Sequence, residues 1–99
     1  MFTGLIADLG QVSALELGEG GAVLTVGTRL AAELSEGDSI AVNGVCLTAI
    51  EVGDGSFKAE AMSETLERTT LGRISEGSLV NIEVDIIAKH VERLLEARA

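Results

Sequence analysis

The stretch DSIAVNGVCLTAIEV, residues 38–52, decides the fold class of this chain. Two runs rich in β-branched and apolar residues flank the dipeptide Asn43-Gly44, which is typical of a two-residue type I′ hairpin turn. Within the second run, Ile50-Glu51-Val52 alternates apolar and polar residues, as a half-buried strand does. The stretch therefore predicts a β-hairpin with strands over residues 38–42 and 45–52.

Similar runs recur on both sides of this hairpin, so the chain is predicted to be mainly β. Further strands are expected over residues 11–17, 22–28, 56–62 and 78–85. Twelve glycines and no proline supply the turns between them. Six short strands within residues 1–85 favour a small barrel or sandwich, and closure into a barrel best removes the exposed strand edges.

Two short helical segments are expected between the strands. One covers residues 29–34, and the other covers residues 64–68 with Ser63 as its N-cap. The turns Ser35-Glu36-Gly37 and Ser75-Glu76-Gly77 each lead into a strand. We interpret their likeness as shared turn chemistry and not as a duplicated unit.

The last segment, IIAKHVERLLEARA, has a helical and not a strand period. Its apolar residues Ile87, Val91 and Leu94 recur at 3.6-residue spacing, and Asp85 is placed to cap the N-terminus. We expect residues 86–99 to form a C-terminal α-helix. Its apolar stripe can pack on the barrel or against the same helix in other subunits.

Composition excludes several classes of function. The 99 residues fit one domain, and 16 acidic against 7 basic residues give a net charge of −9, which argues against nucleic-acid partners and anionic membrane surfaces. No apolar run is long enough for a membrane span, and the N-terminus lacks the features of a signal peptide, so we expect a cytoplasmic protein.

One cysteine, Cys46, and one histidine, His90, exclude an internal disulfide and a multi-thiolate metal site. Because only 2% of residues are aromatic, the interior is expected to consist of Val, Leu, Ile and Ala.

The residues by themselves do not indicate an activity. Cys46 in an apolar strand is most simply a buried small hydrophobic residue, and Thr48 is a good strand former. His90 fits the surface of the C-terminal helix, and Glu60 and Glu64 fit a solvated acidic face. The residues alone therefore predict an acidic all-β domain with a C-terminal helix.

Three strings are more specific. The opening MFTGLI at residues 1–6, VNGVCLT at 42–48, and MSETL at 62–66 followed by Leu71-Gly72 resemble the riboflavin synthase family in order and approximate spacing. The resemblance implies a six-stranded Greek-key β-barrel over residues 1–85 that binds lumazine, followed by an oligomerisation helix over residues 86–99. It also implies a homo-oligomer, a trimer or higher, because terminal helices of this family cluster around a three-fold axis.

Typical members of this family carry two such barrels in tandem, and their active site lies between the first barrel of one subunit and the second barrel of another. Two molecules of 6,7-dimethyl-8-ribityllumazine exchange a four-carbon unit there, which gives riboflavin and 5-amino-6-ribitylaminouracil, and no cofactor is required. The first 70 residues of this chain look like the first barrel, and its end looks like the end of the second barrel. The Asp and Ser of second barrels and the histidine-containing stretch between the barrels have no match here.

The resemblance also implies a ligand site. Phe2, Cys46 and Thr48 would be its catalytic residues, with Phe2 covering the ring. Glu60 would accept hydrogen bonds from ribityl hydroxyls. The ligand-binding residues implied in this way are Gly4, Leu5, Ile6, Cys46, Leu47, Thr48, Glu60, Ala61, Met62, Ser63, Glu64 and Thr65.

Two functions are therefore predicted as alternatives. The first is a flavin-binding or storage protein that holds riboflavin or the lumazine in one barrel. The second is a minimal riboflavin synthase, a transferase in which two identical barrels pair face to face. A structural oligomer with a vestigial pocket is a third alternative.

Overall fold

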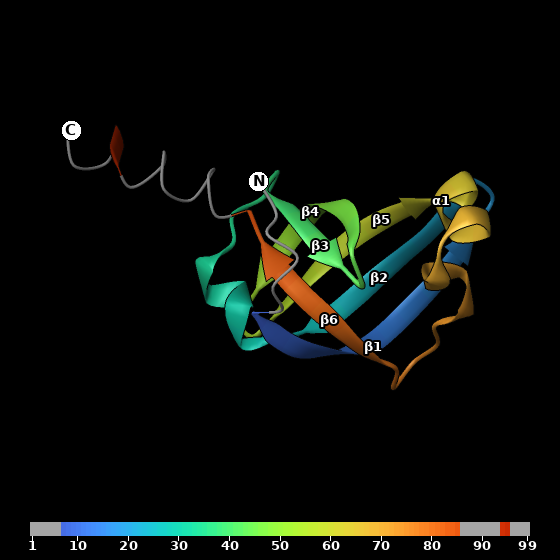
Figure 1. The fold of residues 1–99 in the computed structure, drawn as a ribbon, viewed down its shortest axis with the longest axis horizontal. Helices are drawn as coiled ribbons and strands as arrows, with labels where there is room; N and C mark the ends of the chain where they lie inside the picture. Colours follow the sequence, from blue (N-terminus) through green and yellow to red (C-terminus); the bar gives the residue numbers. More distant parts are fainter. Residues whose placement is uncertain (1–6, 86–93, 96–99) are drawn as a thin grey trace.

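The computed structural model describes residues 7–85 and 94–95 of the chain. Six strands account for most of the described residues, and three short helical segments connect them (Figure 1). The strands are β1 (Asp8–Gly18), β2 (Gly21–Gly27), β3 (Ser39–Val42), β4 (Val45–Gly53), β5 (Ser56–Met62) and β6 (Leu79–Val84), and the helical segments are η1 (Arg29–Glu33), α1 (Ser63–Arg68) and η2 (Thr70–Arg73).

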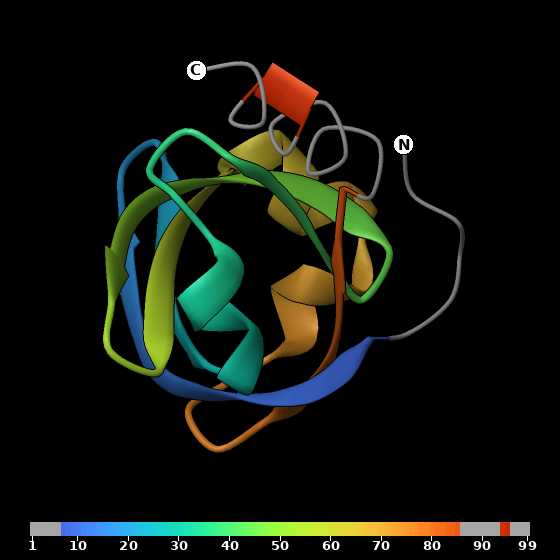
Figure 2. The same ribbon diagram turned by 90° about the vertical axis from the view of Figure 1, so that its left-hand side faces the viewer.

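The strands form a closed antiparallel barrel, as the sequence predicted. Their order around the barrel is β1-β2-β5-β4-β3-β6, and β6 pairs with β1 to complete the ring. Figure 2 shows this ring end-on, and Figure 1 shows that η1 lies at one end of the barrel and that α1 and η2 lie at the other. The C-terminal helix predicted over residues 86–99 lies outside the described residues, except for Leu94 and Leu95, which are helical and exposed.

Alternation along the strands fills the barrel with apolar side chains. In β2, for example, Ala22, Leu24 and Val26 are buried, and the residues between them face outward. Small and large residues share the core, and Phe57 is the largest side chain that is fully buried. The predicted interior of Val, Leu, Ile and Ala is therefore correct except that an aromatic ring lies among them.

The caps of the helical segments differ from the prediction. Ser63 is the first residue of α1 and not its cap, because Met62 takes the N-cap position and makes no side-chain cap hydrogen bond. The side-chain caps are threonines instead: Thr28 Oγ1 accepts from the N–H of Leu30 before η1, and Thr69 Oγ1 accepts from the N–H of Leu71 before η2. No sequence pattern predicted η2.

The Asn43-Gly44 turn fixes the position of the β3–β4 hairpin relative to β6. Both residues have positive φ, 50° and 80°, as a type I′ turn requires. The Asn43 N–H donates to the Asn81 carbonyl oxygen, and the Asn43 Oδ1 accepts from the Asn81 N–H, each over 2.8 Å. One side chain therefore extends the β3–β6 pairing beyond the last strand residue.

Replacing Asn43 by alanine should destabilise the barrel by about 2 kcal/mol. Alanine loses the Asn81 hydrogen bond and also has to adopt a left-handed conformation. Asn43→Gly loses the same hydrogen bond without the conformational cost, so its loss should be about half as large. Urea unfolding followed by circular dichroism measures both variants. Equal losses in the two variants would show that the positive φ carries no cost.

The two halves of the barrel repeat one arrangement. Gly37 and Gly77 occupy equivalent turns, with φ of 91° and 90°. The Gly37 N–H donates to the carbonyl of Ala49, and the Gly77 N–H donates to the carbonyl of Val12. The strand register shifts next to both acceptors, between residues 12 and 14 and between residues 49 and 51. The likeness of the two turns therefore extends to the strands they contact, whereas the sequence indicated shared turn chemistry alone.

Candidate functional site

The two halves of the barrel differ at one end of their hairpins, where β1–β2 and β4–β5 adjoin helical segments. Beyond its register shift, the β1–β2 ladder continues through Val12–Val26 to the Gln11–Gly27 pair. The β4–β5 ladder ends at the corresponding first pair, Ala49 with Ala59. The start of β4 and the end of β5 therefore separate, and among the described residues they pair only with β3 and β2 on their other sides.

On the β1–β2 side, charged and polar side chains bridge the strands beyond the ladder. The Thr28 hydroxyl donates to Asp8 Oδ2 over 2.6 Å, and Arg29 Nε donates to Asp8 Oδ1 over 3.2 Å. The hydrogen bond from Thr28 is the main cause that lowers the pKa of the Asp8 carboxyl below its ordinary value, and Arg29 acts in the same direction. The Asp8 carboxylate thereby links the start of β1 to Thr28 and Arg29, the two residues that follow β2.

On the β4–β5 side, the separated strands border a cavity of about 270 Å³, which we call the β4–β5 cavity. Cys46, Thr48 and Glu60 point outward from the barrel and are exposed, since their neighbours along each strand face the core. Thr65 adds a hydroxyl from α1. The lining residues are Cys46, Leu47, Thr48, Ile50, Glu60, Met62 and Thr65.

This cavity brings together six residues that the sequence analysis placed in the ligand site: Cys46, Leu47, Thr48, Glu60, Met62 and Thr65. The simplest interpretation of Cys46 as a buried residue was wrong, because its side chain is exposed. Ile50 was not predicted. It continues the outward positions 46 and 48 of β4, so the strand alternation could have identified it.

The other predicted site residues do not line the cavity or are not described. Ala61 is buried in the barrel core, and Ser63 is exposed on α1. Glu64 forms an ion pair with Arg68 at 3.3 Å on the surface of α1. Phe2, Gly4, Leu5 and Ile6 lie outside the described residues, so their roles stay predictions.

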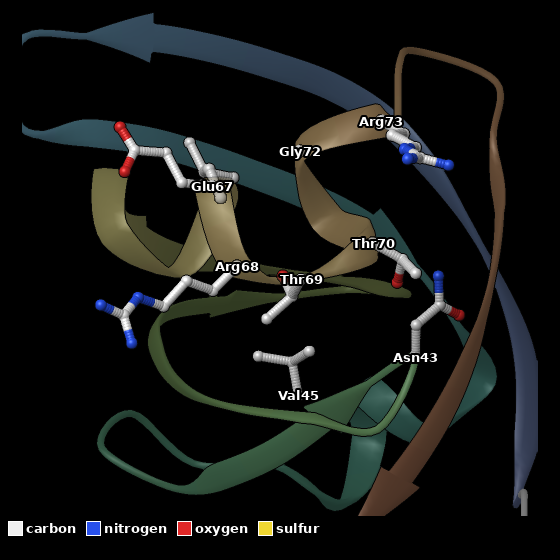
Figure 3. A pocket seen from close by; sticks show the side chains of 9 residues that line it. Asn43, Val45, Glu67, Arg68, Thr69, Thr70, Gly72 and Arg73 are labelled. Atoms are coloured by element: carbon white, nitrogen blue, oxygen red, sulfur yellow. The ribbon is translucent and has the colours of Figure 1, made fainter.

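A larger cavity lies beside α1 and η2 and contains none of the predicted site residues. This α1 groove, about 630 Å³, is lined by Asn43, Val45, Leu66, Glu67, Arg68, Thr69, Thr70, Gly72 and Arg73. In Figure 3 the side chains of Arg68 and Arg73 extend in different directions, so they do not form one cationic site. The smaller β4–β5 cavity is the better candidate for a ligand site, because it is bordered by the ends of two strands that do not pair with each other.

Residues 3–85 match the family model described as the lumazine binding domain. The chain belongs to the lumazine binding domain family. The match includes both strands that border the β4–β5 cavity.

Relatives of this lumazine binding domain are riboflavin synthases. Those of Mycobacterium tuberculosis, Actinobacillus pleuropneumoniae and Bacillus subtilis are 48%, 43% and 36% identical to the chain, in each case over 84% of its residues. The aligned part covers 42%, 39% and 39% of these three proteins. The chain thus spans about two-fifths of the length of these relatives.

Two further observations concern the described residues of this lumazine binding domain. They contain no group of three or more His, Cys, Asp or Glu side chains that could hold a metal ion. None of their helices is both long and apolar enough to cross a bilayer.

Proposed function

We propose that the barrel binds riboflavin or 6,7-dimethyl-8-ribityllumazine in the β4–β5 cavity. The observation that carries this proposal is the early end of the β4–β5 ladder, which leaves main-chain groups of two facing strands beside a cavity. Membership of the lumazine binding domain family supports it.

The lining suits a flat, neutral heterocycle with a hydroxylated chain. Main-chain N–H and C=O groups at the ends of β4 and β5 can pair with the amide-like edge of a pyrimidine-dione, much as another strand would. Ile50 and Met62 are 44% and 64% exposed, so they offer apolar surface to the ring. Glu60 can accept hydrogen bonds from hydroxyl groups.

The volume of the cavity implies that other groups complete the site. Pockets for ligands of this size occupy about 300–1,000 Å³, whereas the β4–β5 cavity measures about 270 Å³. Phe2 and the main chain of Gly4, Leu5 and Ile6 are the predicted cover. In this proposal they close the ring-binding side.

A second candidate function is a minimal riboflavin synthase. Its relatives named riboflavin synthase favour it, as does the presence of Cys46 and Thr48 in the lining of the cavity. Two barrels paired through these cavities would hold two lumazine molecules in contact, and such proximity can lower a bimolecular barrier by several kcal/mol. A homo-oligomer, trimeric or larger, and a cytoplasmic location stay predictions.

Titration of riboflavin with the protein tests binding. The chain has no Trp and no Tyr, so flavin emission is free of strong protein emission. Riboflavin fluorescence should be quenched, with saturation at micromolar protein. An unchanged signal and polarisation at high protein concentration would contradict the proposal.

Turnover distinguishes the two candidate functions. Incubation with 6,7-dimethyl-8-ribityllumazine should give stoichiometric binding without riboflavin formation if the domain is a binding protein. Steady appearance of riboflavin, proportional to protein concentration, would identify the synthase instead.

A further inference from the structure

A second groove adjoins the β4–β5 cavity through Glu60. This β1–β2 groove, about 240 Å³, is lined by Glu16, Leu17, Gly18, Gly20, Gly21, Ala22, Val23 and Glu60. Glu60 also lines the β4–β5 cavity, so the two spaces share one carboxylate side chain. A ligand too large for the first space can extend into the second beside this residue.

The strand register arranges the floor of the β1–β2 groove. Glu16 pairs with Val23, and Val23 pairs with Glu60, so the three residues form a row across β1, β2 and β5. Their side chains share the outer face of the barrel, because the residues on either side of Val23 and Glu60 are buried. With strands about 4.8 Å apart, the two glutamates stand about 10 Å apart, at opposite ends of the row.

The charged side chains that line the β1–β2 groove and the β4–β5 cavity are all negative. Neither is lined by a Lys or Arg side chain. Glu16 and Glu60 are both exposed, and the chain carries a net charge of −9. Carboxylates accept hydrogen bonds from hydroxyl groups, but they repel another anion in the same groove.

We propose that the β1–β2 groove receives the polyol chain of the ligand and that Glu16 and Glu60 select against a phosphate at the end of that chain. This inference rests on the proposed function and specifies its ligand as the unphosphorylated form. A phosphate monoester carries a charge of about −1.5 to −2 at pH 7. Next to two carboxylates, it should bind more weakly than the free hydroxyl.

The test compares riboflavin with riboflavin 5′-phosphate, which differ only in this terminal group. For the unmodified protein, the dissociation constant of the phosphate ester should exceed that of riboflavin by about tenfold or more, or about 1.4 kcal/mol. Glu16→Gln should reduce this ratio several-fold, and Glu16→Lys should reduce it further. Raising the salt concentration should also reduce it, because salt screens the repulsion between exposed charges.

Glu36→Gln is the matched control. It removes the same charge from an exposed turn that lines neither space, so the ratio should stay that of the unmodified protein. Circular dichroism verifies that each variant is folded. Glu60→Gln should reduce the ratio and also weaken riboflavin, because Glu60 lines both spaces.

The outcomes separate this inference from the proposed function. If riboflavin binds but its phosphate binds equally well, or if Glu16→Gln changes the ratio no more than Glu36→Gln does, the inference is wrong and the proposed function stands. If riboflavin itself does not bind, the proposed function fails and the inference fails with it.

Discussion

Replacing Gly21 by alanine should lower the free energy of unfolding by about 3 kcal/mol or more. Gly21 begins β2 with a φ of 147°, a backbone conformation that residues with a Cβ rarely adopt. A Cβ at this position would lie 2.0 Å from the carbonyl oxygen of Ala61. That oxygen belongs to the backbone of β5, so it cannot move without shifting the strand that carries Glu60 and Met62.

Gly20→Ala is the control for this change. The two glycines are adjacent, but a Cβ on Gly20 would have no atom within 4 Å, and Gly20 is not among the residues with positive φ. Its unfolding free energy should stay within about 0.5 kcal/mol of the unmodified protein. Urea unfolding of both variants gives the comparison, and similar midpoints for the two would mean that β2 and β5 do not approach as closely as described.

Replacing Thr48 by tryptophan should abolish riboflavin binding without unfolding the barrel. Thr48 is exposed on β4, and its side chain lines the β4–β5 cavity. An indole at this position fills a large part of a 270 Å³ space. Because the side chain points away from the core, the cost to stability should be small. Fluorescence titration of riboflavin measures the loss, with circular dichroism to verify the fold.

Two further variants make this result specific. Leu79→Trp places the same ring on β6, where Leu79 is 61% exposed, and should leave binding intact. Cys46→Ser keeps the size of a cavity residue and should change the dissociation constant by no more than about tenfold. Normal binding by Thr48→Trp would show that the ligand site lies elsewhere.

Most of the barrel follows from local sequence patterns. The predicted hairpin over residues 38–52 and the predicted strand over residues 56–62 match β3, β4 and β5 closely. Glycine turns and alternating residues determine these elements, and both are local properties. The predicted cap at Ser63 was wrong because a non-local contact decides it: the pairing of β5 with β2 continues to Met62, so the N-cap position falls on a side chain that makes no cap hydrogen bond.

The candidate site depended on information that a local pattern does not contain. The resemblance to a family indicated Cys46, Thr48 and Glu60, whereas the residue types alone favoured a buried cysteine. Their shared position at one cavity depends on where the β4–β5 ladder ends, and this is a property of two strands and a register shift between residues 49 and 51. The proposed role of Glu16 depends on the register of three strands, β1, β2 and β5.

The pairing of β6 with β1 also determines how the chain can be reconnected. Asp8 pairs with Ile82, and the Ala7 N–H donates to the carbonyl of Ile82 over 2.9 Å, so the barrel begins and ends side by side. A circular permutant could therefore join residue 85 to residue 1 through a glycine linker, which keeps residues 1–6, and open the chain between Asp54 and Gly55, which are exposed at a hairpin tip. Every strand pair would be kept, and the new termini at Asp54 and Gly55 would lie at the opposite end of β4 from Cys46 and Thr48, so either terminus could carry a fused sensor without obstructing the cavity.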